Sequence, residues 1–477
     1  MAIDPTKVLI IVNTNTDTGI SPASPSMAGY PTIAAASLAN ADYYATARGL
    51  RTNGNYLKIG FNFGSLWNSP MTPSVVIPTR PGQQSVDKLL PAIVTTIAGV
   101  STAYNALPLL AAIAQFCTDN AVEAILVECN VPPCIWIGHQ SGYADYIPTE
   151  TLLSFSPTYK SGVVPSAPSF VEAGQGAGTA IYPSRGLSTP TMGLTAARTT
   201  FASNNTKLAL PGFASGNLLS GTFPKSNLMQ LYKKAQLAVQ IPNGRIGYPG
   251  ATSADVQRIV TDAIWAEQQD NRAKSHLIGG RGYPSTPNEP YDNVTSNYLF
   301  ASNGFTNLSR FGPQGYAEYT GAVVDTTAWE TGTLSTTAFA VLFGGGSQDP
   351  RYYLPEAKVI ANYQNGYSGG ESGFSFIYKN HTPMRGGWGF AWQSSAYMLG
   401  MCVITKGGCT AVCNVMEPYV QGLPDQLEFT TNLLSGLSMM ESVYLSAGMT
   451  APRTTVYGDP LYSPYKLTAV SPNEFLL

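Results

Sequence analysis

Residues 7–14, KVLIIVNT, form a short run of apolar, β-branched residues that is typical of a strand buried in a parallel sheet. Residues 37–50, SLANADYYATARGL, follow with apolar residues at helical spacing and a glycine near the end. NYLKIGFN (55–62) alternates as a second strand, and AVEAILVEC (121–129) predicts a third strand after a helical region over 89–118. This alternation predicts right-handed crossovers and an α/β fold with a helix-flanked, mostly parallel sheet.

The same pattern returns in the second half of the chain. AVQIPNGRIGYPG (238–250) precedes a predicted helix over 252–269, for which Thr252 or Ser253 can serve as the N-cap. The apolar positions of this helix are Val256, Ile259, Val260 and Ile264. SHLIGG (275–280) and AFAVLFGGG (338–346) predict further strands. GWGFAW predicts a strand before Ser394, and CTAVCNVMEPYV follows it. QLEFTTNLLSGLSMMESVYLSA predicts a helical region before the ending TTVYGDPLYSPY.

The chain has 477 residues, which is more than one hydrophobic core usually organises, so several lobes are expected. Residues 1–145 predict an N-terminal α/β lobe, and residues 146–225 predict a Ser-, Gly- and Pro-rich insertion. Residues 226–465 predict a C-terminal α/β lobe with a loop-rich block over 350–388, and residues 466–477 extend beyond it as a C-terminal arm.

Charge is scarce along the whole chain. Only 11% of the residues are charged, against about 25% in an average soluble protein, and the net charge is -2. A balance of 26 basic and 28 acidic residues excludes electrostatic attraction to nucleic acid or to an anionic membrane. A surface built from Ser, Thr, Asn, Gln, Gly and Tyr favours packing against other subunits, either copies of this chain or neighbouring structural proteins.

The beginning of the chain, MAIDPTKVLIIVNTNT, lacks the basic residues and the long apolar run of a signal peptide. We therefore expect synthesis in the cytoplasm, with later incorporation into a virion or an extracellular assembly. The longest uncharged stretch, between Lys88 and Asp119, is interrupted by Pro91 and Pro108, which favours buried helices over a membrane span.

Three residues near one another in sequence are weak candidates for a metal site, namely Cys129, Cys134 and His139. Their spacing is not that of a zinc site, and no second Cys or His pair follows closely. Buried thiols or a disulfide are favoured over metal binding, and no cofactor is expected.

Two serines, Ser394 and Ser395 in GFAWQSSAYMLG, lie between a predicted strand and a predicted helix, where hydrolases often carry a nucleophile. Such a serine needs a base, and the chain offers His139, His276 and His381. His381 is 13 residues before Ser394, so a hairpin could bring it close. The flanking glycines of a nucleophile elbow are absent, and a serine that caps the following helix is the favoured interpretation.

Glu417 in EPY and Asp459 in GDP are acids in a chain that has few of them. Together they could form a carboxylate pair for acid–base chemistry, but Asp459 before Pro460 also suits a structural turn, and we favour that role. Arg245 could pair with one of these acids in a buried network, or bind a substrate carboxylate. GGGSQD (344–349) lacks the lysine of a phosphate loop and favours a tight turn.

Three segments carry a family resemblance. NGRIGYPGATSADVQRIVTDAIWAEQ (243–268), AVCNVMEPYV (411–420) and VYGDPLYSPY (456–465) occur in this order. The chain resembles an uncharacterised bacterial family whose members end in Gly-Asp-Pro-Leu-Tyr-x-Pro and carry a Glu-Pro-Tyr segment before it. The resemblance covers most of the chain and is strongest over 240–270 and 388–465.

More distantly, the first of these segments is similar to the start of the catalytic lobe in gingipain-like cysteine peptidases, which have a caspase-like α/β fold. That resemblance implies a His-Gly pair after one strand and a cysteine nucleophile after the next. The corresponding positions carry Gly344 to Gly346 and Ser394 or Ser395, so both members of the dyad are absent.

These observations predict a caspase-like or gingipain-like scaffold without peptidase activity, used as a structural or assembly component of a virion, tail or surface layer. One alternative is a hydrolase that uses Ser394 or Ser395 with His381, or Glu417 with Asp459. The other is a carbohydrate- or peptide-binding module on the Tyr-rich loops over 350–388.

Overall fold

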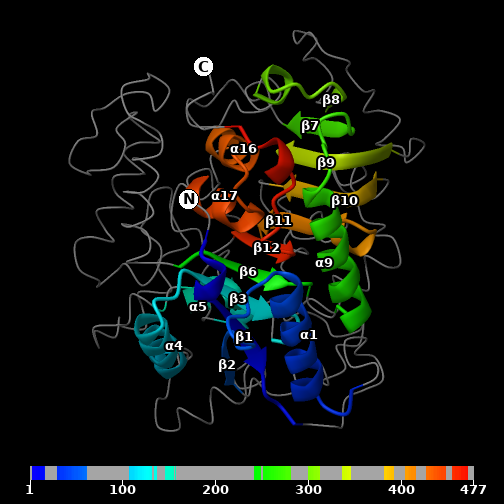
Figure 1. The fold of residues 1–477 in the computed structure, drawn as a ribbon. Coiled ribbons are helices and arrows are strands. Elements are labelled where there is room, and N and C mark those ends of the chain that lie inside the picture. The colour runs from blue at the N-terminus through cyan, green and yellow to red at the C-terminus, as the bar shows by residue number, and fades with distance from the viewer. Residues whose placement is uncertain are drawn as a thin grey trace, which may run out of the picture.

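The central feature of the fold is a ten-stranded mixed sheet with helices packed on it (Figure 1). The structure is a computed structural model, and it describes residues 3–16, 30–61, 107–131, 134–136, 146–154, 156, 241–248, 251–280, 299–311, 336–344, 381–391, 403–414, 426–446 and 454–470. The predicted α/β class with a mostly parallel, helix-flanked sheet is confirmed, because eight of the nine strand pairings are parallel.

The sheet consists of two parallel halves of five strands each that meet at one antiparallel pairing. The first half contains, from the edge inward, β2 (Leu57–Phe61), β1 (Val8–Asn13), β3 (Ala124–Glu128), β6 (Asn243–Ile246) and β12 (Thr454–Gly458). The second half contains, from the other edge inward, β8 (Leu308–Phe311), β7 (His276–Gly280), β9 (Thr336–Gly344), β10 (His381–Ala391) and β11 (Thr410–Asn414). β12 and β11 pair antiparallel at the centre.

Both halves follow the same winding order. In each, the second strand lies outside the first (β2 beside β1, β8 beside β7), and the third lies on the other side (β3, β9). A reversal of this kind is a topological switch point, where open α/β sheets commonly place ligand sites at the carboxyl ends of the strands. The halves do not follow the order of the chain, because β12, the last strand, completes the half that begins with β1.

Local sequence explains most of these elements. All six residues of β1 are buried, as its apolar run predicts, whereas β2 alternates between half-buried and exposed residues at the sheet edge. α9 (Ser253–Glu267) starts at the N-cap Thr252, whose hydroxyl accepts from Asp255 N while the Asp255 carboxylate accepts from Thr252 N, a capping box that confirms the predicted cap. Three of the four predicted apolar positions of α9 are buried, and the fourth, Ile264, is partly buried.

The remaining helices and strands cover the sheet or its ends. They are η1 (Pro5–Lys7), α1 (Ile33–Ala47), α4 (Leu107–Asp119), β4 (Cys134–Trp136), β5 (Tyr146–Pro148), α5 (Thr149–Ser154), α16 (Gln426–Leu434), α17 (Met439–Ser446) and η9 (Lys466–Thr468). α1 and α9 pack against each other along one side of the sheet (Figure 1). β4 and β5 form a separate antiparallel pair.

The helical region predicted over 426–447 is two helices rather than one. Gly436, with a backbone φ of +83°, ends the first, and Ser438 begins the second by accepting from Glu441 N while Glu441 accepts from Ser438 N. The same buried Glu441 carboxylate accepts from Ile3 N at 2.8 Å, so the start of the chain lies beside α17 (Figure 1).

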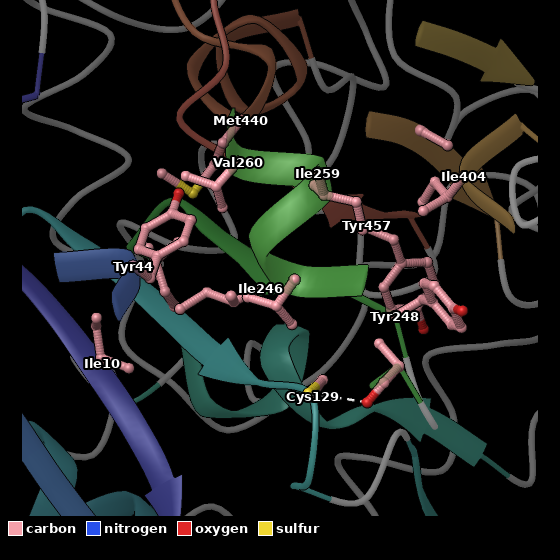
Figure 2. Packing of buried hydrophobic residues seen from close by; sticks show 14 of the residues in the cluster. Ile10, Tyr44, Cys129, Ile246, Tyr248, Ile259, Val260, Ile404, Met440 and Tyr457 are labelled. Atoms are coloured by element: carbon pink, nitrogen blue, oxygen red, sulfur yellow. Dashed lines mark hydrogen bonds between the residues drawn. The ribbon is translucent and has the colours of Figure 1, made fainter. Parts of the chain in front are cut away.

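The buried core falls into two clusters. One joins β1, β3, α1 and α9 and includes Tyr44, Ile246, Val260 and Met440 (Figure 2). The other lies in the second half and is rich in aromatic residues: Phe300, Phe305, Phe339, Trp388, Phe390, Phe429, Tyr462 and Tyr465. The first cluster also includes Leu277, Val341 and Ala411 of the second half, so it extends across the central strands.

Candidate functional site

The segment that follows β12, Asp459 to Tyr465, is anchored to several other parts of the fold, and we call it the C-terminal clamp. Asp459 is fully buried. One carboxylate oxygen accepts from the Tyr44 hydroxyl at 2.7 Å and from Leu461 N at 3.2 Å. The other accepts from Nε of Arg48 at 2.7 Å and from Nη2 of the same guanidinium.

Arg48, at the end of α1, also bridges to a second buried acid. Its Nη1 lies 2.8 Å from Oε1 of Glu267, and that oxygen accepts from Ser463 N at 2.9 Å. Burial acts to lower the pKa of Arg48, but the two carboxylates, Asp459 foremost, raise it above its ordinary value. Burial raises the pKa of Glu267, and Arg48 opposes that shift only in part.

The rest of the clamp is held in the same way, by internal hydrogen bonds. Tyr462 donates to the Gly386 carbonyl at 2.6 Å, and Pro464 accepts from the Asn271 amide at 2.6 Å. The hydroxyl oxygen of Tyr465 lies 2.8 Å from Nε2 of the buried His276. Every polar contact described for Asp459 is therefore structural, and its predicted partner in an acid pair, Glu417, lies outside the described residues.

Arg245 takes part in a buried network, but with an acid other than those considered from sequence. Its Nη2 lies 2.8 Å from Oε2 of Glu150, and both side chains are fully buried. Nη1 donates to the carbonyls of Glu128 and Val131. Thr455 of β12 donates to the other oxygen of Glu150, so this network ties β6, α5 and β12 together.

A second polar centre lies at the carboxyl ends of β1 and β3, beside the switch point of the first half. Glu128, the last residue of β3, is fully buried. Five groups donate to its carboxylate: the Ser37 hydroxyl (2.6 Å), the Asn40 amide (2.9 Å), the Cys129 thiol (2.9 Å), Asn130 N (2.8 Å) and the Asn130 amide (2.8 Å). Asn13, the last residue of β1, donates from its amide to the Asn130 carbonyl at 3.0 Å.

We refer to these residues as the Glu128 cluster. A carboxylate has about four lone-pair positions, and five internal donors already occupy those of Glu128. The cluster therefore holds the ends of β1 and β3 and the start of α1 together. A carboxylate surrounded in this way is a poor general base, because its lone pairs are committed to the protein.

The candidate metal ligands are only partly described. The Cys129 thiol is buried in the first core cluster (Figure 2), and burial, followed by the Glu128 charge, raises its pKa well above the ordinary value. The Cys134 side chain and all of His139 lie outside the described residues. Among the residues that the structure does describe, no three His, Cys, Asp or Glu side chains are grouped to hold a metal ion.

The two positions that correspond to the peptidase dyad follow neighbouring parallel strands. β9 pairs with β10 up to Phe343 and Ala391, and Gly344 is the last described residue of β9. Ser394 and Ser395 follow β10 by three and four residues and lie outside the described part of the chain, as does Gly346.

His381, the candidate base, begins β10 and pairs with Thr336 at the opposite end of the strand pair from Ala391. The partner strand advances seven residues from Thr336 to Phe343, which at about 3.3 Å per residue separates the two ends by about 23 Å. Ser394 and Ser395 follow the end of β10 that is far from His381. Either serine can approach His381 only if the three or four residues after Ala391 reverse direction and run back along β10.

No sequence motif marks Glu128, Arg48, Glu267 or the Tyr44 hydroxyl. Their one signal is that they are polar residues within otherwise apolar strands and helices, in a chain where only 11% of residues are charged. His276 was named only as a possible base. Its role in the C-terminal clamp depends on contacts across 189 residues, which no local pattern reveals.

The chain matches no protein-family model, no curated protein and no solved structure. Within the described residues, no helix has both the length and the apolar character to cross a membrane.

Proposed function

We propose that this protein is a non-catalytic structural component that assembles with copies of itself or with neighbouring structural subunits. The main observation in support is that the buried carboxylates of the described residues are bound by other groups of the protein. Asp459, Glu267, Glu128, Glu150 and Glu441 are all buried, and each accepts hydrogen bonds from the protein itself. They hold distant segments together, and their lone pairs are used in contacts within the protein.

The described cysteines support the same proposal. Burial raises the pKa of Cys117 to about 12, and it also raises the pKa of Cys129 and Cys409. The thiolate is the nucleophilic form, so these side chains are kept in the unreactive thiol form. They behave as small apolar residues of the core rather than as catalytic groups.

We further propose that the scaffold is caspase-like. In support, the strands that precede the two dyad positions are neighbours, parallel and in register up to Phe343 and Ala391. A histidine after one and a cysteine after the other would lie at one sheet edge, as the resemblance requires. The sequence has Gly345 and Ser394 in these regions, so the scaffold would lack the chemistry of such a peptidase.

The low charge of the chain and its Ser-, Thr-, Asn- and Tyr-rich composition support an assembly role. We propose a virion, tail or surface-layer component that is made in the cytoplasm.

Electron microscopy and light scattering after size-exclusion chromatography test this proposal on the full chain. We expect regular assemblies much larger than the 50.6 kDa monomer. A monodisperse monomer across a wide concentration range would contradict the assembly role.

A serine-directed fluorophosphonate probe tests the absence of catalysis. We expect no labelling of the wild-type protein. Labelling that disappears in Ser394→Ala or Ser395→Ala but persists in Ser435→Ala, a serine at the end of α16, would instead establish a hydrolase.

A further inference from the structure

His276 occupies a closed aromatic cage at the start of β7. Its side chain is fully buried. Four rings surround it, with centroids 5.0 to 5.9 Å away: Phe300, Phe305, Phe339 and Tyr465. Tyr465 is the last residue of the C-terminal clamp, so this cage is one of the places where the clamp is attached to the second half of the sheet.

The hydrogen bonds of the imidazole define the tautomer of its neutral form. Nδ1 lies 2.7 Å from the Lys274 carbonyl, which can only accept, so Nδ1 carries the hydrogen. Nε2 lies 2.8 Å from the Tyr465 hydroxyl. In a neutral imidazole Nε2 is then the acceptor, and Tyr465 donates to it. Both ring nitrogens are used. An imidazolium could keep both contacts by donating from each nitrogen, so it is the burial of the ring that favours the neutral form.

Charge near the ring opposes protonation. Burial lowers the pKa of His276 to about 4, the hydrogen bond to the Lys274 carbonyl acts in the opposite direction, and the Lys274 ammonium lowers it further. That ammonium lies over the rings of Trp265 and Phe339, at 4.7 and 4.5 Å from their centroids. The groups described around the imidazole are otherwise Tyr465 and uncharged phenylalanine rings, without a carboxylate among them.

Protonation would reverse the bond that holds Tyr465. A hydrogen on Nε2 points at the Tyr465 oxygen, so the hydroxyl must turn its own hydrogen away, toward the surrounding phenylalanine rings. The imidazolium would also be buried beside Lys274 without a counter-ion, which is costly in an apolar environment. The charged histidine is accommodated more easily when the clamp leaves the cage and water enters.

We propose that His276 is an acid-sensitive latch for the C-terminal clamp. At neutral pH the neutral imidazole holds Tyr465 and the clamp is closed. On acidification the imidazole takes up a proton as the clamp detaches, which loosens the segment from Asp459 to Tyr465 and the adjoining central strand β12. Glu267, at the other end of the clamp, acts in the opposite direction, because its raised pKa makes the closed state take up a proton in acid. The latch does not depend on the proposed assembly role.

Hydrogen exchange followed by mass spectrometry measures the opening of the clamp in the full chain. With pKa values of about 4 closed and 6.5 open, His276 alone should raise the opening equilibrium about twentyfold between pH 7 and pH 5, after correction for the intrinsic exchange rate, and Glu267 reduces this rise. We expect this rise in peptides covering 454–470 and a smaller one in peptides covering α9.

His276→Gln is the test variant, because an amide can still donate to the Lys274 carbonyl and accept from Tyr465 but does not titrate in this range. His381→Gln is the matched control. We expect the rise to be lost in the first and retained in the second. A rise that persists in His276→Gln, or a wild-type clamp that opens equally at both pH values, would overturn the latch.

A titration of the wild-type protein provides a check that needs no variant. With labelled histidine, the three imidazoles can be followed by NMR as the pH falls. We expect one of them to stay neutral until the clamp peptides begin to exchange, and to titrate together with that opening. Three imidazoles that all titrate near 6.5 with the clamp still closed would contradict the proposal.

Discussion

Replacing Arg48 with methionine tests the buried ion cluster that anchors the C-terminal clamp. Methionine keeps an unbranched apolar stem but removes the guanidinium, which contacts Asp459 through two nitrogens and Glu267 through a third. The three side chains are 7%, 0% and 8% exposed, so water cannot replace the lost partner without opening the clamp. Removing one partner of a buried ion pair costs about 3–5 kcal/mol, because the remaining charge is left uncompensated.

Two features of the cluster place the expected loss within that range. Asp459 keeps its hydrogen bonds from Tyr44 and Leu461, and Glu267 keeps the one from Ser463, so neither carboxylate is wholly without donors. However, two buried carboxylates then lie close together without a cation. We therefore expect the free energy of unfolding to fall by about 3–5 kcal/mol at pH 7.

Urea unfolding followed by circular dichroism and tryptophan fluorescence, at pH 7 and pH 5, measures this loss. Arg48 lowers the pKa of Glu267, so without Arg48 that pKa should rise further in the folded state. The folded variant then takes up protons in acid, and its deficit relative to wild type should be smaller at pH 5 than at pH 7. The matched control is Arg272→Met, whose ion pair with Asp270 is 44% and 49% exposed, and it should leave the unfolding midpoint unchanged.

A small effect would refute the reasoning. If Arg48→Met changed stability no more than Arg272→Met does, the cluster would be solvated and the clamp would not depend on it. A deficit that grew on acidification would also contradict the argument, because it would mean that the Glu267 carboxylate is not neutralised in the folded variant.

Four further predictions follow from individual contacts. Thr252→Ala removes the N-cap and half of the capping box of α9, and should lower the free energy of unfolding by about 1 kcal/mol in the same urea assay. Gly458→Ala should lower the free energy of unfolding by about 2–5 kcal/mol, because φ is +100° there and a Cβ would clash with the Cys409 carbonyl. Its control, Gly54→Ala, has a φ of +83° but no atom near the added Cβ, and should lower it by only about 1–2 kcal/mol. Glu267→Gln should keep the contacts to Arg48 and Ser463. Wild type gains stability as the pH falls from the raised pKa of Glu267 toward its ordinary value of 4.5, and the variant should lose this gain. A variant with the wild-type pH dependence of stability would contradict the raised pKa of Glu267. Iodoacetamide at pH 8 should leave Cys117, Cys129 and Cys409 unmodified in the native protein and alkylate them in guanidinium, as peptide mapping can establish.

The sequence by itself determined the local elements. The apolar run at Val8 to Asn13 specifies a buried strand because its side chains are β-branched and uncharged on both faces. Thr252 and Asp255 specify the start of α9 because a capping box needs only residues three apart. The strand, helix, strand order of the first lobe then predicts a parallel sheet, which is confirmed. These features depend on neighbours in the chain, and a sequence displays them directly.

Only the tertiary structure decided which elements meet. No periodicity indicates that the last strand, β12, lies in the middle of the sheet between β6 and β11, or that the sheet reverses direction there. Arg48 contacts Asp459 across 411 residues and Glu267 across 219, and Arg245 pairs with Glu150 across 95. Such pairings depend on strand order and register, which are set by the burial of whole faces and the closure of long loops. The local sequence around a residue therefore does not indicate which distant residue it will contact.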